Sequence, residues 1–109
     1  MDRIPESDWK KLRALKDDFL NVACERILVK AHGVISDRSK GSYAAYLALW
    51  QLLKTEDGKI ALMFDEFKRS TAVLKLVAWK RNSLISDAAL AEFSEETQEA
   101  VRALTSIQR

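Results

Sequence analysis

The sequence has 109 residues, of which 48% are apolar and 31% charged, with a formal net charge of +2 at pH 7. This length suits a single domain over 1–109, and the composition argues against intrinsic disorder. So small a charge does not by itself indicate a nucleic-acid partner, and one proline with three glycines is too few for the many turns of an all-β chain.

The sequence also indicates where in the cell the protein is found. No apolar run approaches the ~20 residues that a membrane-spanning helix needs, and the N-terminus lacks the basic and then apolar pattern of a signal peptide. Cys24 is the single cysteine of the sequence, so no internal disulfide can form, which suits a reducing compartment. We therefore expect a cytoplasmic protein without a membrane contact.

The first helix is predicted over 7–32, with Gly33 as its stop. Apolar residues recur along it at helical spacing, first on one face and then on a neighbouring one. Arg26 falls on an apolar face and therefore needs a carboxylate or carbonyl partner. Cys24 has apolar neighbours and is expected to be buried. We expect His32 to lie at the negative end of the helix as a favourable charge rather than a catalytic group.

A second helix is predicted over 42–55, and its apolar run 43–53 organises the rest of the chain. The run contains one strongly polar residue, Gln51, and neither glycine nor proline. It carries two apolar stripes, which are Tyr43, Tyr46 and Trp50 on one side and Ala45, Leu49 and Leu52 on another. We interpret the aromatic stripe as core, with a subunit interface or a ligand pocket as alternatives.

A tight turn is predicted at 56–59, followed by a third helix over 57–82 that packs antiparallel to the second. Apolar residues in this helix step by four and three, as in a helix–helix seam. The pattern leaves open whether the helix is continuous or kinked near Ser70. Two short helices follow over 86–93 and 94–107, the second starting at Ser94 as N-cap. These elements predict an all-α fold, a compact helical bundle of three main helices and two short ones.

Two groups of polar residues inside these helices are candidates for specific contacts. Carboxylates and guanidinium groups within apolar seams predict a buried polar network of Arg26, Asp65, Glu66 and Arg69. A strip of basic residues with one aromatic, at the second half of the third helix, could hold a nucleic-acid backbone and a stacked base. Its members are Lys68, Lys75, Trp79, Lys80 and Arg81.

Catalytic and metal-binding patterns are not found in the sequence. One histidine and one cysteine cannot form a multi-histidine or zinc site, and no glycine-rich phosphate loop occurs. We therefore predict no enzyme activity, no metal and no cofactor.

The leading functional hypothesis is a helical protein–protein interaction or regulatory module that forms a homodimer, because the second helix has more apolar surface than one small bundle buries. An unidentified protein partner is part of this hypothesis. A nucleic-acid-binding regulator is the first alternative, and a ligand sensor with a pocket lined by Tyr46 and Trp50 is the second.

Overall fold

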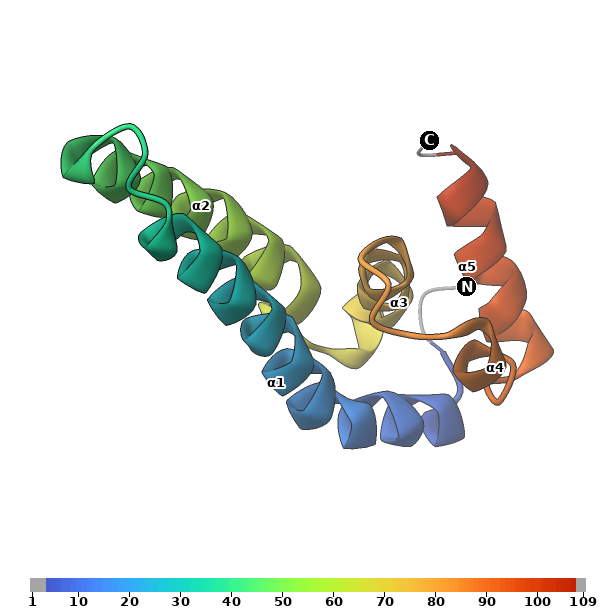
Figure 1. Ribbon diagram of the computed structural model, residues 1–109. Helices are drawn as coiled ribbons and strands as arrows, with labels where there is room; N and C mark the ends of the chain where they lie inside the picture. Colours follow the sequence, from blue (N-terminus) through green and yellow to red (C-terminus); the bar gives the residue numbers. More distant parts are fainter. Residues whose placement is uncertain (1–3, 108–109) are drawn as a thin grey trace.

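The computed structural model describes residues 4–107, and within this range the regular structure is entirely helical (Figure 1). The elements are α1 (Glu6–Ser36), α2 (Ser42–Phe64), a 3₁₀ turn η1 (Arg69–Thr71), α3 (Ala72–Arg81), α4 (Asp87–Leu90) and α5 (Glu95–Ile107). The predicted all-α class is confirmed. None of these helices, within the part of the chain that is described, has both the length and the apolar character needed to cross a membrane.

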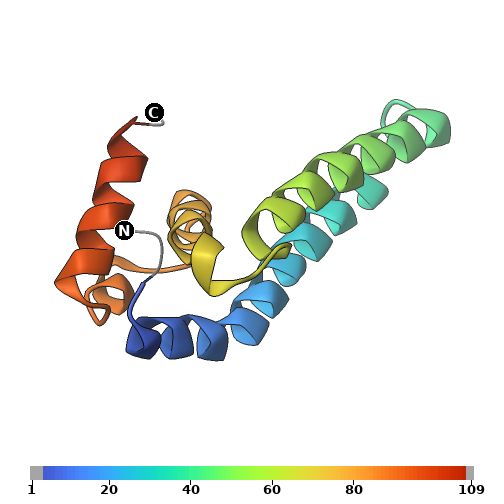
Figure 2. The same cartoon turned by 180° about the vertical axis from the view of Figure 1, so that it is seen from behind.

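The molecule consists of a projecting helical hairpin and a base (Figures 1 and 2). Helix α2 runs antiparallel along the second half of α1, and we call this hairpin, residues 22–60, the arm. The base comprises the first half of α1, the end of α2, and the segment from η1 to α5. The molecule measures 52 × 27 × 24 Å with a radius of gyration of 16.7 Å, against about 13 Å for a compact chain of this length. The shape is therefore more extended than the compact bundle that the sequence predicts.

The turn predicted at 56–59 is wrong, because α2 passes through Gly58 without a break. Glycine inside a helix costs only about 1 kcal/mol relative to alanine, so favourable neighbours can outweigh it. Glu56 supplies such contacts, with ion pairs to Lys59 at 3.2 Å and to Lys30 of α1 at 3.6 Å. The stop predicted at Gly33 is wrong for the same reason, since α1 continues to Ser36.

Replacing Gly58 with alanine is expected to raise the free energy of unfolding by about 0.5–1 kcal/mol, because alanine lowers the entropy of the unfolded chain. A β-carbon at this position would meet no atom within 4 Å. Urea denaturation measures the change. Gly41→Ala is the matched control, since Gly41 has a φ of +98°, and there we expect a loss of about 1 kcal/mol or more. Equal effects at both positions would contradict the helical conformation of Gly58.

The third helix predicted over 57–82 is also wrong as one element, because the chain leaves the helix between Phe64 and Arg69. Two side chains of α3 satisfy the carbonyl groups at the end of α2, which is how the break is stabilised. The Lys75 Nζ atom donates to the Leu62 oxygen at 2.9 Å, and Trp79 Nε1 donates to the Met63 oxygen at 3.2 Å. The question left open near Ser70 is answered by a short 3₁₀ turn, not by a smooth kink.

The base contains nearly all of the buried core. Trp79 is fully buried, with Phe19 edge-on to its ring and Phe64 and Phe67 at centroid distances of 5.9 and 5.8 Å. Helix α3 carries this tryptophan and packs against both α2 and α5. Ser94 caps α5 as predicted, because its Oγ accepts from the Thr97 backbone N–H at 3.3 Å.

The arm, in contrast, has almost no core. Over residues 22–60, all of which the structure describes, Ala23 and Ala31 alone are buried. Two helices in a hairpin can cover only one side of each other, so every remaining apolar side chain of the arm faces outward. These exposed apolar side chains form the candidate site.

Candidate interaction surface

Helix α2 uses one of its two apolar stripes to pack on α1. Ala45, Leu49 and Leu52 are half-buried at a spacing of four and three residues, and Ile60, eight residues after Leu52, is half-buried too. This spacing is the a/d pattern of packed helix pairs. The stripe of Tyr43, Tyr46 and Trp50 lies about 125° farther round the helix, because each residue adds about 100°. It therefore points to one side of the hairpin, not toward α1.

Two grooves show which residues of α1 lie on the same side. A groove of about 480 Å³ near the base is lined by Cys24 together with Trp50, Leu53 and Asp57. Another, of about 190 Å³ near the tip, is lined by Ile35 and Arg38 together with Tyr46. Leu28 lies between Cys24 and Ile35 at helical spacing. We call this side the aromatic face, with the members Cys24, Leu28, Ile35, Tyr43, Tyr46, Trp50 and Leu53.

The aromatic face is open to solvent. Tyr43 is 74% exposed, Tyr46 56%, Trp50 60% and Leu28 62%. The interpretation of the aromatic stripe as core is therefore wrong. The expected burial of Cys24 is wrong too, because its thiol is exposed. Both errors have one cause: the helix that would cover this side of the arm is not supplied by the described chain.

The exposed area is large for a single chain. With about 150–250 Å² for a whole aromatic side chain, the exposed parts of the seven members amount to roughly 700 Å². The largest apolar patch of a typical monomer covers about 300–600 Å². A stable dimer covers about 800 Å² on each partner, so the aromatic face has nearly the apolar area of a complete interface.

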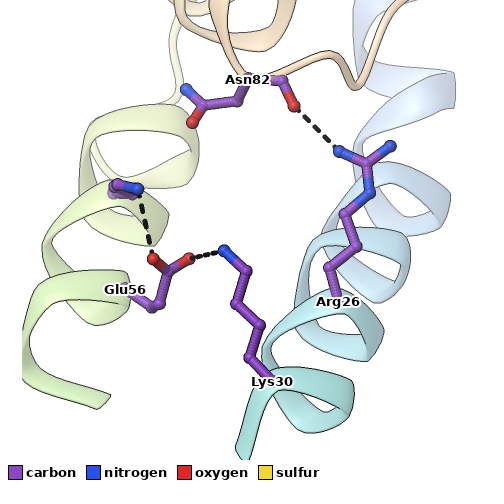
Figure 3. A network of polar contacts seen from close by, with 5 residues as sticks. Arg26, Lys30, Glu56 and Asn82 are labelled. Carbon is purple, nitrogen blue, oxygen red and sulfur yellow. Dashed lines mark hydrogen bonds and ion pairs between the residues drawn. The ribbon is translucent and has the colours of Figure 1, made fainter. Parts of the chain in front are cut away.

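The opposite side of the arm carries the polar network around Arg26 drawn in Figure 3, and we call it the polar side. It already has a partner, which is the base. Arg26 donates to the carbonyl oxygens of Asn82 and Ser83, each at 2.9 Å, at the end of α3. A groove of about 400 Å³ on this side is lined by Arg26, Lys30 and Glu56 together with Asn82, and also by apolar residues, of which Val29 is 62% exposed. The base is thus attached to the polar side and leaves the aromatic face uncovered.

The predicted buried polar network is not formed. Arg26 binds backbone carbonyl groups, and Arg69 donates to the Ile4 oxygen at 2.8 Å and to Glu6 at 3.1 Å. Asp65 and Glu66 are exposed, and Glu66 instead pairs with Lys68 at 3.1 Å. Asp65, Glu66 and Arg69 were placed together by an uninterrupted third helix, but the chain is not α-helical between Phe64 and Ala72, so that their helical spacing is lost.

The predicted basic strip is not assembled either. Lys75 is 8% exposed and Trp79 is fully buried, so neither can contact a nucleic acid. Burial lowers the pKa of Lys75, and the nearby carboxylates of Asp65 and Glu66 act in the opposite direction. Lys80 lies 3.8 Å from Asp87, and Arg81 donates to the Thr105 oxygen. The helical period was right within 72–81, but Lys75 and Trp79 face the core, while Lys68 and Arg81 remain exposed.

The remaining candidates for chemistry are dispersed. His32 is exposed on α1, four residues before the helix end. Within residues 4–107 no three His, Cys, Asp or Glu side chains are grouped so that they could hold a metal ion. Tyr46 and Trp50, proposed to line one ligand pocket, line two separate shallow grooves.

Several members of the aromatic face were missed by the sequence reasoning. Cys24, Leu28, Ala31 and Ile35 step by four, three and four along α1, and this pattern could have been recognised as a second seam. It was obscured because Ala23, Ile27 and Val34 form another apolar stripe beside it. No protein-family model, curated protein sequence or solved structure matches the chain.

Proposed function

We propose that this protein is a non-enzymatic helical interaction module that self-associates through the aromatic face. The observation that supports the proposal is the contrast between the two sides of the arm. One side binds the base through Arg26, and the other exposes roughly 700 Å² of mainly apolar surface. Aromatic residues and few charges at the centre are typical of protein interfaces.

The nucleic-acid alternative loses support, because two of its five proposed contact residues are buried. The ligand-sensor alternative loses support as well, since the aromatic residues line open grooves instead of one cavity. A cytoplasmic location remains part of the proposal and rests on the single cysteine, whose exposed thiol suits a reducing compartment.

Light scattering after size-exclusion chromatography tests the proposal. We expect twice the chain mass of 12.4 kDa at micromolar concentration. Trp50→Glu is expected to weaken association at least about 30-fold, because loss of a central aromatic residue costs about 2 kcal/mol or more. The matched control is Thr55→Glu, an exposed position on the other side of the same helix. A wild-type monomer at these concentrations would refute self-association.

A further inference from the structure

The aromatic face ends in charges of opposite sign. Toward the tip, Ile35 and Tyr46 are followed by Arg38, which lines the same groove, and Lys40 lies in the tip loop. Toward the base, the α2 stripe of Tyr46, Trp50 and Leu53 continues to Asp57 at the next helical step. Lys54 lines the base groove too, but it lies about 60° away from Asp57 round the helix.

The α1 side of the face repeats this polarity. Seven residues before Cys24, the same face of α1 carries Asp17, which is exposed. Within the described residues, neither Arg38 nor Asp57 forms an ion pair, although Arg38 donates to the Ile35 oxygen at 2.6 Å. The apolar stripe is therefore bounded by Arg38 at the tip and by Asp57 and Asp17 at the base end, and the charges of Arg38 and Asp57 are available to a partner. The neighbouring Asp37 of the tip accepts hydrogen bonds from Ser39 instead.

A second copy could cover the aromatic face in two directions. With the arms parallel, tip would lie beside tip, so that Arg38 approaches its own equivalent and Asp57 does the same. With the arms antiparallel, each Arg38 approaches Asp57 of the partner subunit. Both directions bring the same apolar residues together, and complementary charges then favour one orientation over the other.

The position of the base agrees with the antiparallel direction. Arg26 of the arm binds the Asn82 carbonyl of the base (Figure 3) and the Ser83 carbonyl as well, so the base is attached on the side of the arm away from the aromatic face. It projects from only one end of the arm (Figures 1 and 2). Antiparallel arms place the two bases at opposite ends, where they do not compete for space.

We propose that two copies pack their aromatic faces together antiparallel, tip to base, and form a four-helix bundle with Arg38 of each chain beside Asp57 of the partner subunit. Such a bundle supplies the core that the arm lacks, and its two-fold symmetry makes each contact occur twice. The inference rests on the proposed self-association and adds the relative direction of the two arms.

A charge exchange tests the direction. Arg38→Asp and Asp57→Arg are each expected to weaken association about tenfold, because each places two like-charge pairs at the rim. The double variant should return to within about threefold of wild type, since the pairs are restored with opposite sign. Glu25→Arg, an acidic-to-basic change on the polar side, is the control and should leave association unchanged.

Disulfide trapping gives an independent readout. In a Cys24→Ser background, chains carrying Arg38→Cys are mixed with longer, tagged chains carrying Asp57→Cys and then oxidised. We expect the mixed disulfide as the main product. A dimer that instead links position 38 to position 38, or a double variant without recovery, would refute the antiparallel direction and leave self-association intact. A wild-type monomer would refute both proposals.

Discussion

Replacing Trp79 with alanine is expected to lower the free energy of unfolding by about 3–5 kcal/mol. Trp79 is fully buried, and three aromatic rings surround it. The substitution also removes the donor to the Met63 carbonyl, which terminates α2 against α3. Because a domain of this size has only about 5–15 kcal/mol of stability in total, the variant should be close to unfolding at room temperature. Urea denaturation followed by far-ultraviolet circular dichroism measures the loss.

Trp50→Ala is the matched control, because it deletes the same side chain from a 60% exposed position. At a concentration low enough for the chain to be monomeric, we expect little change in its unfolding free energy. Association should weaken instead. Comparable losses of monomer stability at both positions would show that the aromatic face is covered within one chain, which would contradict the open arm.

Helix starts were the most predictable part of this fold. Ser86 and Ser94 each precede a helix where the sequence places one, whereas α2 begins at Ser42 itself, without a side-chain cap. A serine N-cap accepts a hydrogen bond from a backbone N–H two or three residues later, so the local sequence is enough to predict the start of the helix. The Ser86 side chain, for example, accepts from the Ala89 backbone N–H at 3.0 Å.

Helix ends were less predictable, because they depend on contacts between distant residues. The break after Phe64 contains no glycine or proline, and the side chains that stabilise it, Lys75 and Trp79, come 11 and 15 residues later in the numbering. The helix end predicted at Gly58 was wrong, because glycine costs a helix only about 1 kcal/mol. The stabilisation that the surrounding helix gains from packing and ion pairs is larger than this cost.

Which apolar stripe is covered could not be decided from the period of the sequence. The stripes that contain Leu49 and Trp50 have similar helical spacing and similar apolar character. Only the position of α1 distinguishes them: it half-buries Leu49 and leaves Trp50 exposed. The hypothesis of a dimer was based on an excess of apolar residues on this helix, and the structure adds the location of that excess.

Asp8 is the buried carboxylate that joins the two ends of the described chain. It is 1% exposed, and both the Ser94 and Thr97 hydroxyl groups donate to its carboxylate at 2.6 Å. The Ser94 backbone N–H also donates to it, at 3.2 Å. The carboxylate thus satisfies donors at the start of α5 and lies at the positive end of that helix.

The pKa of Asp8 lies below its ordinary value. Burial is the largest influence and acts to raise the pKa, but the hydrogen bonds from Ser94 and Thr97, with the nearby charge of Lys11, together outweigh it. Because the folded pKa is below the unfolded pKa of about 3.9, the stabilisation from Asp8 is present above that pH and is lost as the pH falls through the folded pKa.

We therefore expect Asp8→Ala to cost about 2–3 kcal/mol near pH 7, because a charged acceptor is removed from three donors of which the Thr97 hydroxyl is buried. The difference between wild type and variant should shrink as the pH falls below about 4, since protonation weakens the same contacts in the wild type. Chemical denaturation at a series of pH values measures both effects. Asp18→Ala, an exposed carboxylate on the same helix, should change stability little at any of these pH values. A difference for Asp8→Ala that persists unchanged at pH 2 would show that the charge of Asp8 does not hold α5 against α1.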